Sequence, residues 1–269
     1  MNLFGDISDF PLLFEEQIEW KGFLHNFLKK ANSEELNKRA VPLFVFVHGY
    51  KGSSYDLRLI RNNLMLIFPS AYFLLSTSNE KTTEIDITKM GENLALEVID
   101  FIKENSNNNI KSINLLGHSL GGIIIRAALP FLVDYKYKMQ TLVTFSTPHL
   151  GLMFSQSSLT NLGVWFFQKW NNAISLKQLS MEDSNEKRYT LLYNMADYMG
   201  IEWFENIVLV GSSQDSYCPF ESGRIDMCLA AVNDNIKGPS YIEMIRKLKA
   251  KITGKNIFRV DVNFKIIKT

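Results

Sequence analysis

A serine between two glycines is the residue of this sequence that could carry nucleophilic chemistry. The stretch Asn114–Gly122 reads Asn-Leu-Leu-Gly-His-Ser-Leu-Gly-Gly, with apolar residues on both sides of it. A serine at a sharp strand-to-helix turn exposes its hydroxyl, and glycines two positions away remove side chains that would collide. Ser119 is therefore the predicted nucleophile, and Gly117 and Gly121 allow the turn. The alternative is an ordinary turn between a strand and a helix.

Backbone amides that could hold a developing negative charge are predicted at two places. One is the N–H of Leu120, which begins the helix expected to run to about residue 129. The other is the N–H of Tyr50, in the loop that follows the apolar run Leu43–Val47. Enzymes with this kind of serine turn place the second donor after an early strand. We interpret His48 as a structural histidine that pins this loop next to Gly49.

The candidate acid is Asp215, which lies in a polar turn after the apolar run Ile207–Gly211. In enzymes with this kind of serine turn, the serine comes first along the chain, the acid second and the histidine last. The order of Ser119 and Asp215 agrees with this. The alternative is an aspartate that caps a turn.

The four histidines of the sequence are His25, His48, His118 and His149, and all precede the candidate acid. His25 is expected to serve packing or the surface. His118 supports the serine turn and is expected to face the interior of the sheet. His149 is expected to hold its own turn by hydrogen bonds, although it is the nearest alternative base. The sequence itself therefore supplies no clear proton acceptor.

Apolar runs alternate with amphipathic segments along the chain. Strands are predicted at 43–47, 71–76, 112–116, 141–145, 207–211 and 256–262, and helices at 11–31, 55–68, 88–105, 120–129 and 241–251. This alternation predicts an α/β fold with a mostly parallel sheet and helices on both faces. Ligands of such sheets bind beyond the carboxyl ends of the strands, where the candidate residues would gather.

The character of the sequence changes between Leu152 and Gly200. An aromatic run, Val164–Trp170, precedes a charged stretch. We interpret 152–200 as a helical cap in which Trp165, Phe166 and Phe167 line an acyl pocket or lid. An equal alternative is that these aromatic residues only pack the insertion onto the sheet.

Composition favours one folded domain over residues 1–269, with residues 1–40 as a helical lead-in. Hydrophobic residues make up 46% and charged residues 21%, and no segment is apolar enough to span a membrane. The net charge of +1 gives no field that would attract nucleic acid. Cys218 and Cys228 are expected to be reduced thiols of a cytoplasmic protein rather than a disulfide. No cofactor and no metal site are predicted.

Four motifs in order carry a family resemblance: Phe46–Gly49, Leu116–Gly122, Ser146–Gly151 and Val210–Asp215. Together they resemble the lipase-like serine esterase family of α/β-hydrolases, and most of all a branch found as the C-terminal domain of larger animal proteins. The resemblance, from about residue 42 to 262, implies a hydrolase of carboxylic esters or lipids with Ser119 as nucleophile and Asp215 as acid. In that family the catalytic histidine follows the last strand, so we expect it and the end of the fold beyond Thr269.

Two functions of different classes follow from these observations. The first is a serine esterase or lipase of lipid metabolism. The second is a catalytically inactive scaffold or interaction subunit with a hydrolase fold, because the fold alone does not make an enzyme. Under either function, a protein partner is expected to cover the incomplete C-terminal edge of the sheet.

Overall fold

The computed structural model describes residues 41–105, 110–154 and 173–265. Residues Arg39–Asn263 belong to one compact unit, and the description below concerns that unit. The helix predicted at 11–31, which includes His25, lies outside the described residues, and so does the aromatic run at 164–170.

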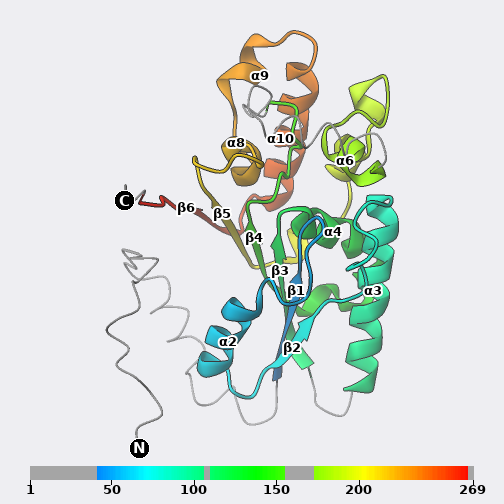
Figure 1. Ribbon diagram of the computed structural model, residues 1–269, viewed down its shortest axis with the longest axis vertical. Helices are drawn as coiled ribbons and strands as arrows, with labels where there is room; N and C mark the ends of the chain where they lie inside the picture. Colours follow the sequence, from blue (N-terminus) through cyan, green and yellow to red (C-terminus); the bar gives the residue numbers. More distant parts are fainter. Residues whose placement is uncertain (1–40, 106–109, 155–172, 266–269) are drawn as a thin grey trace, which may run out of the picture. The chain divides into compact units, whose positions relative to one another are not determined.

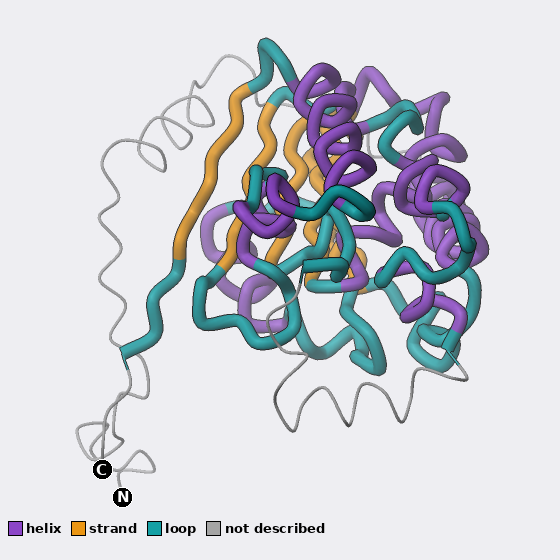
Figure 2. Tube along the Cα trace, turned by 90° about the horizontal axis from the view of Figure 1, so that it is seen from above, coloured by secondary structure: helices purple, strands orange, loops and turns teal. Residues whose placement is uncertain are grey.

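Six strands form a single sheet in which every neighbouring pair is parallel. The strands are β1 (Val41–Val47), β2 (Tyr72–Leu75), β3 (Ile110–His118), β4 (Met139–Phe145), β5 (Asn206–Gly211) and β6 (Asn256–Asp261). Their order across the sheet is β2-β1-β3-β4-β5-β6, and Figure 2 shows them running side by side. The predicted parallel α/β sheet is confirmed, and the predicted strands agree with the observed ones to within a few residues.

Helices connect the strands, as parallel pairing requires. The described helices are α2 (Arg58–Ile67), α3 (Ile87–Glu104), α4 (Leu120–Ala128), α6 (Ile174–Leu179), α7 (Leu191–Met195), α8 (Phe220–Arg224), α9 (Leu229–Asn233) and α10 (Gly238–Ile252). The described 3₁₀ helices are η3 (Leu129–Lys138), η5 (Lys187–Tyr189) and η6 (Ile201–Trp203). No helix within the described ranges is both long enough and apolar enough to cross a bilayer.

Strand β1 shows how the sheet separates two apolar cores. Successive side chains of a strand point to opposite faces. Leu43 and Val45 enter the larger core, which includes residues of α3, α4 and α10. Phe44 and Phe46 enter a smaller core on the other face, against α2. Figure 1 shows α2 on one side of the central strands and α3 on the other. The sheet is therefore buried on both faces where it carries the serine turn.

The packing of α3 against α4 fixes the helix that follows Ser119. At their crossing, a methyl group placed on Gly91 would lie only 2.6 Å from the backbone carbon of Ala127. The two helices can approach this closely only because Gly91 has no side chain. The position of α4 thus depends on a backbone contact in the larger core.

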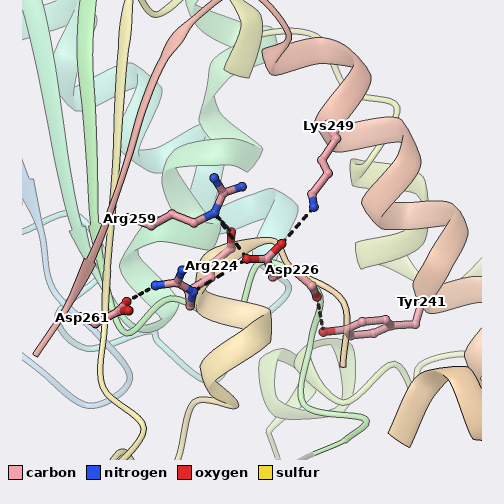
Figure 3. Close-up of polar contacts among 6 residues, drawn as sticks. All are labelled: Arg224, Asp226, Tyr241, Lys249, Arg259 and Asp261. Carbon is pink, nitrogen blue, oxygen red and sulfur yellow. Dashed lines mark hydrogen bonds and ion pairs between the residues drawn. The ribbon is translucent and has the colours of Figure 1, made fainter. Parts of the chain in front are cut away.

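A network of charged side chains joins the end of α8, the following turn, α10 and the edge strand β6. Figure 3 shows its members, Arg224, Asp226, Tyr241, Lys249, Arg259 and Asp261. The carboxylate of Asp226 lies 2.9 Å from Lys249 Nζ and 3.6 Å from Arg259 Nε. Its backbone carbonyl accepts a hydrogen bond from the Tyr241 hydroxyl at 3.1 Å. Asp226 therefore links β6 to the helices that follow β5.

Replacing Asp226 by alanine is expected to destabilise the fold, because its cationic neighbours lose a shared counter-ion. The side chain of Asp226 is 35% exposed, so the expected loss in the free energy of unfolding is only about 1 kcal/mol. Urea unfolding at low and at high salt measures it, and the difference from wild type should shrink in high salt.

The matched control is Asp134→Ala, because Asp134 is exposed. If both variants unfold at the same urea concentration, the network does not stabilise the sheet edge.

Candidate active site

Ser119 lies at a strained turn between β3 and α4. Its backbone has φ 52° and ψ −122°, a conformation that residues other than glycine rarely adopt. Its N–H donates to the Phe145 carbonyl at 2.8 Å, and its carbonyl accepts from Thr147 Oγ1 at 3.0 Å. Residues on β4 and just after it therefore hold the strained serine in place.

Glycines let this turn pack directly against neighbouring backbone. A methyl group placed on Gly117 would lie 2.6 Å from the Cα of Gly122. One placed on Gly121 would collide with the carbonyl oxygens of Val47 and His48. The spacing of the glycines in the sequence thus corresponds to two steric contacts, one within the turn and one with the end of β1.

A pocket of about 250 Å³ opens beside Ser119. It is lined by Gly49, Tyr50, Asp56, His118, Ser119, Ser146, Pro148, Leu152, Leu176, Leu179, Asp215, Tyr217 and Cys218. These residues come from the loops at the carboxyl ends of β1, β3, β4 and β5 and from the segment 152–200, which was predicted to be a cap. The structure thus brings the predicted nucleophile, the loop of Tyr50 and the candidate acid to one cavity. This cavity lies at the carboxyl ends of the strands, where a parallel sheet binds ligands.

Two groups hold the side chain of Tyr50 and the backbone that follows it. The Tyr50 hydroxyl donates to Glu84 Oε1 at 2.9 Å, and Lys51 Nζ lies 2.7 Å from the same oxygen. Lys51 adopts φ 53°, and its N–H donates to Thr83 Oγ1 at 3.0 Å. Burial first, and then the carboxylate of Glu84, raise the pKa of Tyr50 above its usual value. The loop is therefore anchored to the segment between β2 and α3.

The amide of Leu120 is the other group predicted to stabilise negative charge. Leu120 is the first residue of α4. The first N–H groups of a helix have no carbonyl partner within that helix. Partial positive charge from the helix also gathers at this end. The Leu120 N–H and the loop of Tyr50 thus approach Ser119 from the helix and from the end of β1.

Asp215 forms a local turn at the rim of the pocket. Its Oδ1 accepts from the N–H of Tyr217 at 2.8 Å and of Cys218 at 3.0 Å. The aspartate-capped turn weighed as an alternative is therefore present, but it coexists with a place in the pocket lining. The two interpretations do not exclude each other, since these bonds engage only Oδ1.

The prediction that His118 faces the interior of the sheet is wrong. Its side chain is exposed and lines the pocket. Side chains alternate along β3, so His118 points to the same face as Leu116, which packs in the smaller core. Although the residue as a whole is exposed, protein atoms around the ring partly desolvate it and lower the pKa of His118, while the charges of Asp56 and Asp215 act in the opposite direction. The neutral imidazole therefore sits among carboxylates at the rim.

His48 and His149 are both buried, and their hydrogen bonds are local. His48 Nδ1 lies 2.9 Å from the carbonyl oxygen of Gly49. His149 Nε2 lies 3.0 Å from Thr144 Oγ1. Burial and the charge of Arg126 lower the pKa of His149 well below its usual value. A neutral imidazole enclosed in this way is unsuited to act as a base at the pocket.

Cys218 is a thiol that lines the pocket. Burial and the nearby charge of Asp215 raise its pKa. Because the thiolate is the reactive form, Cys218 stays an unreactive thiol at neutral pH. Both Cys218 and Cys228 are free, as predicted.

The sequence also resembles known proteins. Residues 37–230 match the family described as "Putative serine esterase (DUF676)", a match that spans more than half of the chain. The chain belongs to this serine esterase family. The parallel sheet described above accordingly has the α/β-hydrolase fold expected of such a hydrolase.

Solved structures with a similar chain path include three hydrolase-fold proteins. Est1E from Butyrivibrio proteoclasticus, with ferulic acid bound, is 16% identical over 85% of this chain and 82% of its own, with a TM-score of 0.48. Mouse α/β-hydrolase domain-containing protein 10 is 12% identical over 83% of this chain and 81% of its own, with a TM-score of 0.45. The Bacillus licheniformis lipase BlEst2 in propeptide form is 18% identical over 63% of this chain, with a TM-score of 0.43, and the matched part spans 36% of that lipase chain.

Several pocket residues of this esterase family member were not predicted from the sequence. The aromatic residues proposed for the acyl pocket, Trp165, Phe166 and Phe167, lie outside the described residues. Among the described residues, three leucines of the segment 152–200 line the pocket, namely Leu152, Leu176 and Leu179. The spacing of the last two, three residues apart on a helix, was a usable signal. Asp56 carried no comparable signal, and Ser146 was noted only as the first residue of a family motif.

Replacing Tyr50 by phenylalanine should loosen the loop while keeping the ring and the backbone N–H. The lost hydrogen bond to Glu84 is partly exposed, so local opening should become easier by about 1 kcal/mol. Amide hydrogen exchange at residues 49–52 is then expected to become about fivefold faster.

Tyr55→Phe is the control for that change, because Tyr55 is exposed and follows the same loop. Equal exchange at residues 49–52 in both variants would contradict the proposed anchoring.

The low pKa of His149 makes stability depend on pH. Its pKa is depressed in the folded state, so its contribution is complete above the ordinary histidine pKa and is lost as the pH falls below that value. The free energy of unfolding should decline between pH 7 and 5 by up to about 1.4 kcal/mol per pH unit for this one proton. His149→Gln should flatten that decline.

Urea unfolding measured at several pH values tests this expectation. His118→Gln is the companion variant, since the pKa of His118 is lowered as well and it contributes a separate part of the slope. An unchanged slope in His149→Gln would show that the pKa of this ring is not lowered in the folded protein.

Proposed function

We propose that this protein is a serine hydrolase that cleaves carboxylic esters, including lipid esters, through Ser119. The observation that carries the proposal is the serine at φ 52° on a strand-to-helix turn that opens into a pocket. Backbone strain in a residue other than glycine often marks a functional position. Membership of a serine esterase family supports the same reaction class.

In the proposed reaction the Ser119 hydroxyl attacks the ester carbonyl carbon. The N–H groups of Leu120 and Tyr50 then bind the oxyanion that forms on the carbonyl oxygen. This charge develops beside the N-terminus of α4, where the helix dipole favours it. The anchoring of the Tyr50 loop to Glu84 and Thr83 supports the proposal, because donors that are already in place need no reorganisation during the reaction.

The proposed acid is Asp215, which orients a histidine that takes the proton from Ser119 and passes it to the leaving alcohol. In the order of this fold that histidine follows Asp215 along the chain. None of the described histidines suits the role. His48 and His149 are buried, and His118 directly precedes the serine.

The lining of the pocket favours neutral esters as substrates. Leu152, Leu176 and Leu179 offer an apolar surface for an acyl chain. The charged side chains of the lining are the carboxylates of Asp56 and Asp215, with no lysine or arginine among the described lining residues. These carboxylates would repel an anionic group close to Ser119.

The second candidate function is a catalytically inactive scaffold with a hydrolase fold. One observation favours it, namely that none of the histidines that the structure describes is placed to act as a base between Asp215 and Ser119. Such a protein would keep the fold and the pocket without turning over esters, and it would act by binding a protein partner.

Reaction with an alkyl fluorophosphonate, measured by intact mass, separates the two functions. Wild type should take up one label, and Ser119→Ala should take up none while it keeps the wild-type melting temperature. Ser70→Ala, which removes an exposed serine outside the pocket, should label like wild type.

Two results would contradict the proposal. Labelling of Ser119→Ala at the wild-type rate would show that another residue is the nucleophile. A wild-type protein that neither labels nor hydrolyses 4-nitrophenyl butanoate would support the scaffold function.

A further inference from the structure

Ser146 is a second strained serine at the edge of the pocket. It follows the last residue of β4 and adopts φ 47°, a left-handed conformation that is costly for residues other than glycine. Its N–H donates to the Val210 carbonyl at 2.8 Å, just as the N–H of Ser119 donates to Phe145 at 2.8 Å. These two bonds fix the ends of β3, β4 and β5 side by side. Each of the two serines therefore stands at the end of its own strand.

The Ser146 hydroxyl is available to a ligand. The residue is half-buried and lines the pocket beside Ser119. Within the part of the chain that the structure describes, its hydroxyl has no hydrogen-bond partner. The neighbouring hydroxyl of Thr147, in contrast, is bound to the Ser119 carbonyl. Of the two adjacent hydroxyls, one thus holds the turn and the other is open to the cavity.

The order of the strands shows which part of a substrate Ser146 would meet. Four neighbouring strands end at the pocket. At their carboxyl ends, the loop of Tyr50 follows β1, Ser119 follows β3, Ser146 follows β4, and Asp215 lies in the turn after β5. The Tyr50 amide thus lies on the β1 side of Ser119, and Ser146 lies on the opposite side, toward Asp215. In a tetrahedral intermediate the oxyanion points to its amide donors. The leaving oxygen departs on the other side, toward the group that returns the proton.

We propose that the Ser146 hydroxyl donates a hydrogen bond to the alkoxy oxygen of the leaving alcohol, an inference that rests on the proposed esterase function. In this step the bond from Ser119 Oγ to the acyl carbon forms, and the bond from that carbon to the alkoxy oxygen breaks. The proton of Ser119 passes to an imidazole base and from there to the departing oxygen. Ser146 keeps its own proton throughout.

Such a hydrogen bond acts most strongly on poor leaving groups. An alkoxide accumulates more negative charge before it leaves than a nitrophenolate, so it gains more from a donor. Ser146 would therefore widen the range of esters that the site cleaves toward aliphatic alcohols, which include the alcohols of lipid esters.

The test measures kcat/KM for three butanoate esters that share one acyl group, namely the 4-nitrophenyl, phenyl and ethyl esters. Ser146→Ala should hydrolyse the ethyl ester roughly 3- to 10-fold more slowly than wild type, the worth of one hydrogen bond, and the 4-nitrophenyl ester within about twofold of wild type. Ser146→Gly should show the same pattern, although it relieves the backbone strain that Ser146→Ala keeps. Ser70→Ala should match wild type with all three esters.

Three outcomes would overturn the inference. An equal loss with all three esters would mean that Ser146 acts only on the shape of the site. A shifted pKa in the pH profile of kcat/KM, again without leaving-group dependence, would mean that its hydroxyl holds the imidazole base. A wild-type protein that hydrolyses none of the esters would remove the proposed function itself, and the inference with it.

Discussion

Direct backbone contact at the turn between β3 and α4 is the constraint on which the rest of the site depends. Gly121 lies against the carbonyl groups at the end of β1, and Gly117 lies against Gly122. No side chain larger than hydrogen fits at these places. The contact forces Ser119 into its strained conformation and also brings the loop after β1 beside it. Neighbouring elements must then pack against a helix α4 whose position is already fixed. Helix α3 does so at Gly91, which lies directly against the backbone of α4.

A chain of hydrogen bonds ties the loop of Tyr50 to the helix that supplies the pocket leucines. Glu84 holds the Tyr50 hydroxyl, and its backbone carbonyl accepts from the N–H of Ile174 at 2.9 Å, at the start of α6. Further along α6, Gln178 accepts from the N–H of Ile87 at 2.9 Å and binds Asp86, which caps α3. The amide proposed to hold the oxyanion and the surface proposed to hold the acyl chain therefore share one support, so that a shift of α6 would move both.

The buried side chain of Arg126 explains why His149, in the motif Ser146–Gly151, has a structural role. Arg126, on α4, is almost fully buried and donates to the carbonyls of His149 at 2.8 Å and Met195 at 3.2 Å. Burial lowers the pKa of this guanidinium to about 10, so it remains charged at neutral pH. A cation so close to His149 opposes a second positive charge on the ring. Burial and, after it, the cation that joins α4 to the turn after β4 thus lower the pKa of His149.

The sequence by itself determined the class of fold and the chain order of the site, because apolar runs, helical periodicity and glycine spacing are local properties. It predicted the parallel sheet, the strained turn at Ser119 and the polar turn of Asp215 at the pocket. It did not predict the exposure of His118 or the short helices α8 and α9. Nor did it predict that Ser146 lies between Ser119 and Asp215 at the carboxyl ends of the strands. Only the tertiary structure decided these, since the face that a residue at a strand end presents depends on which helix covers it. Local spacing does not encode which residues the neighbouring strands and helices will bury. The tertiary structure therefore also decided which histidines are enclosed and that the hydroxyl of Ser146 is open to a ligand.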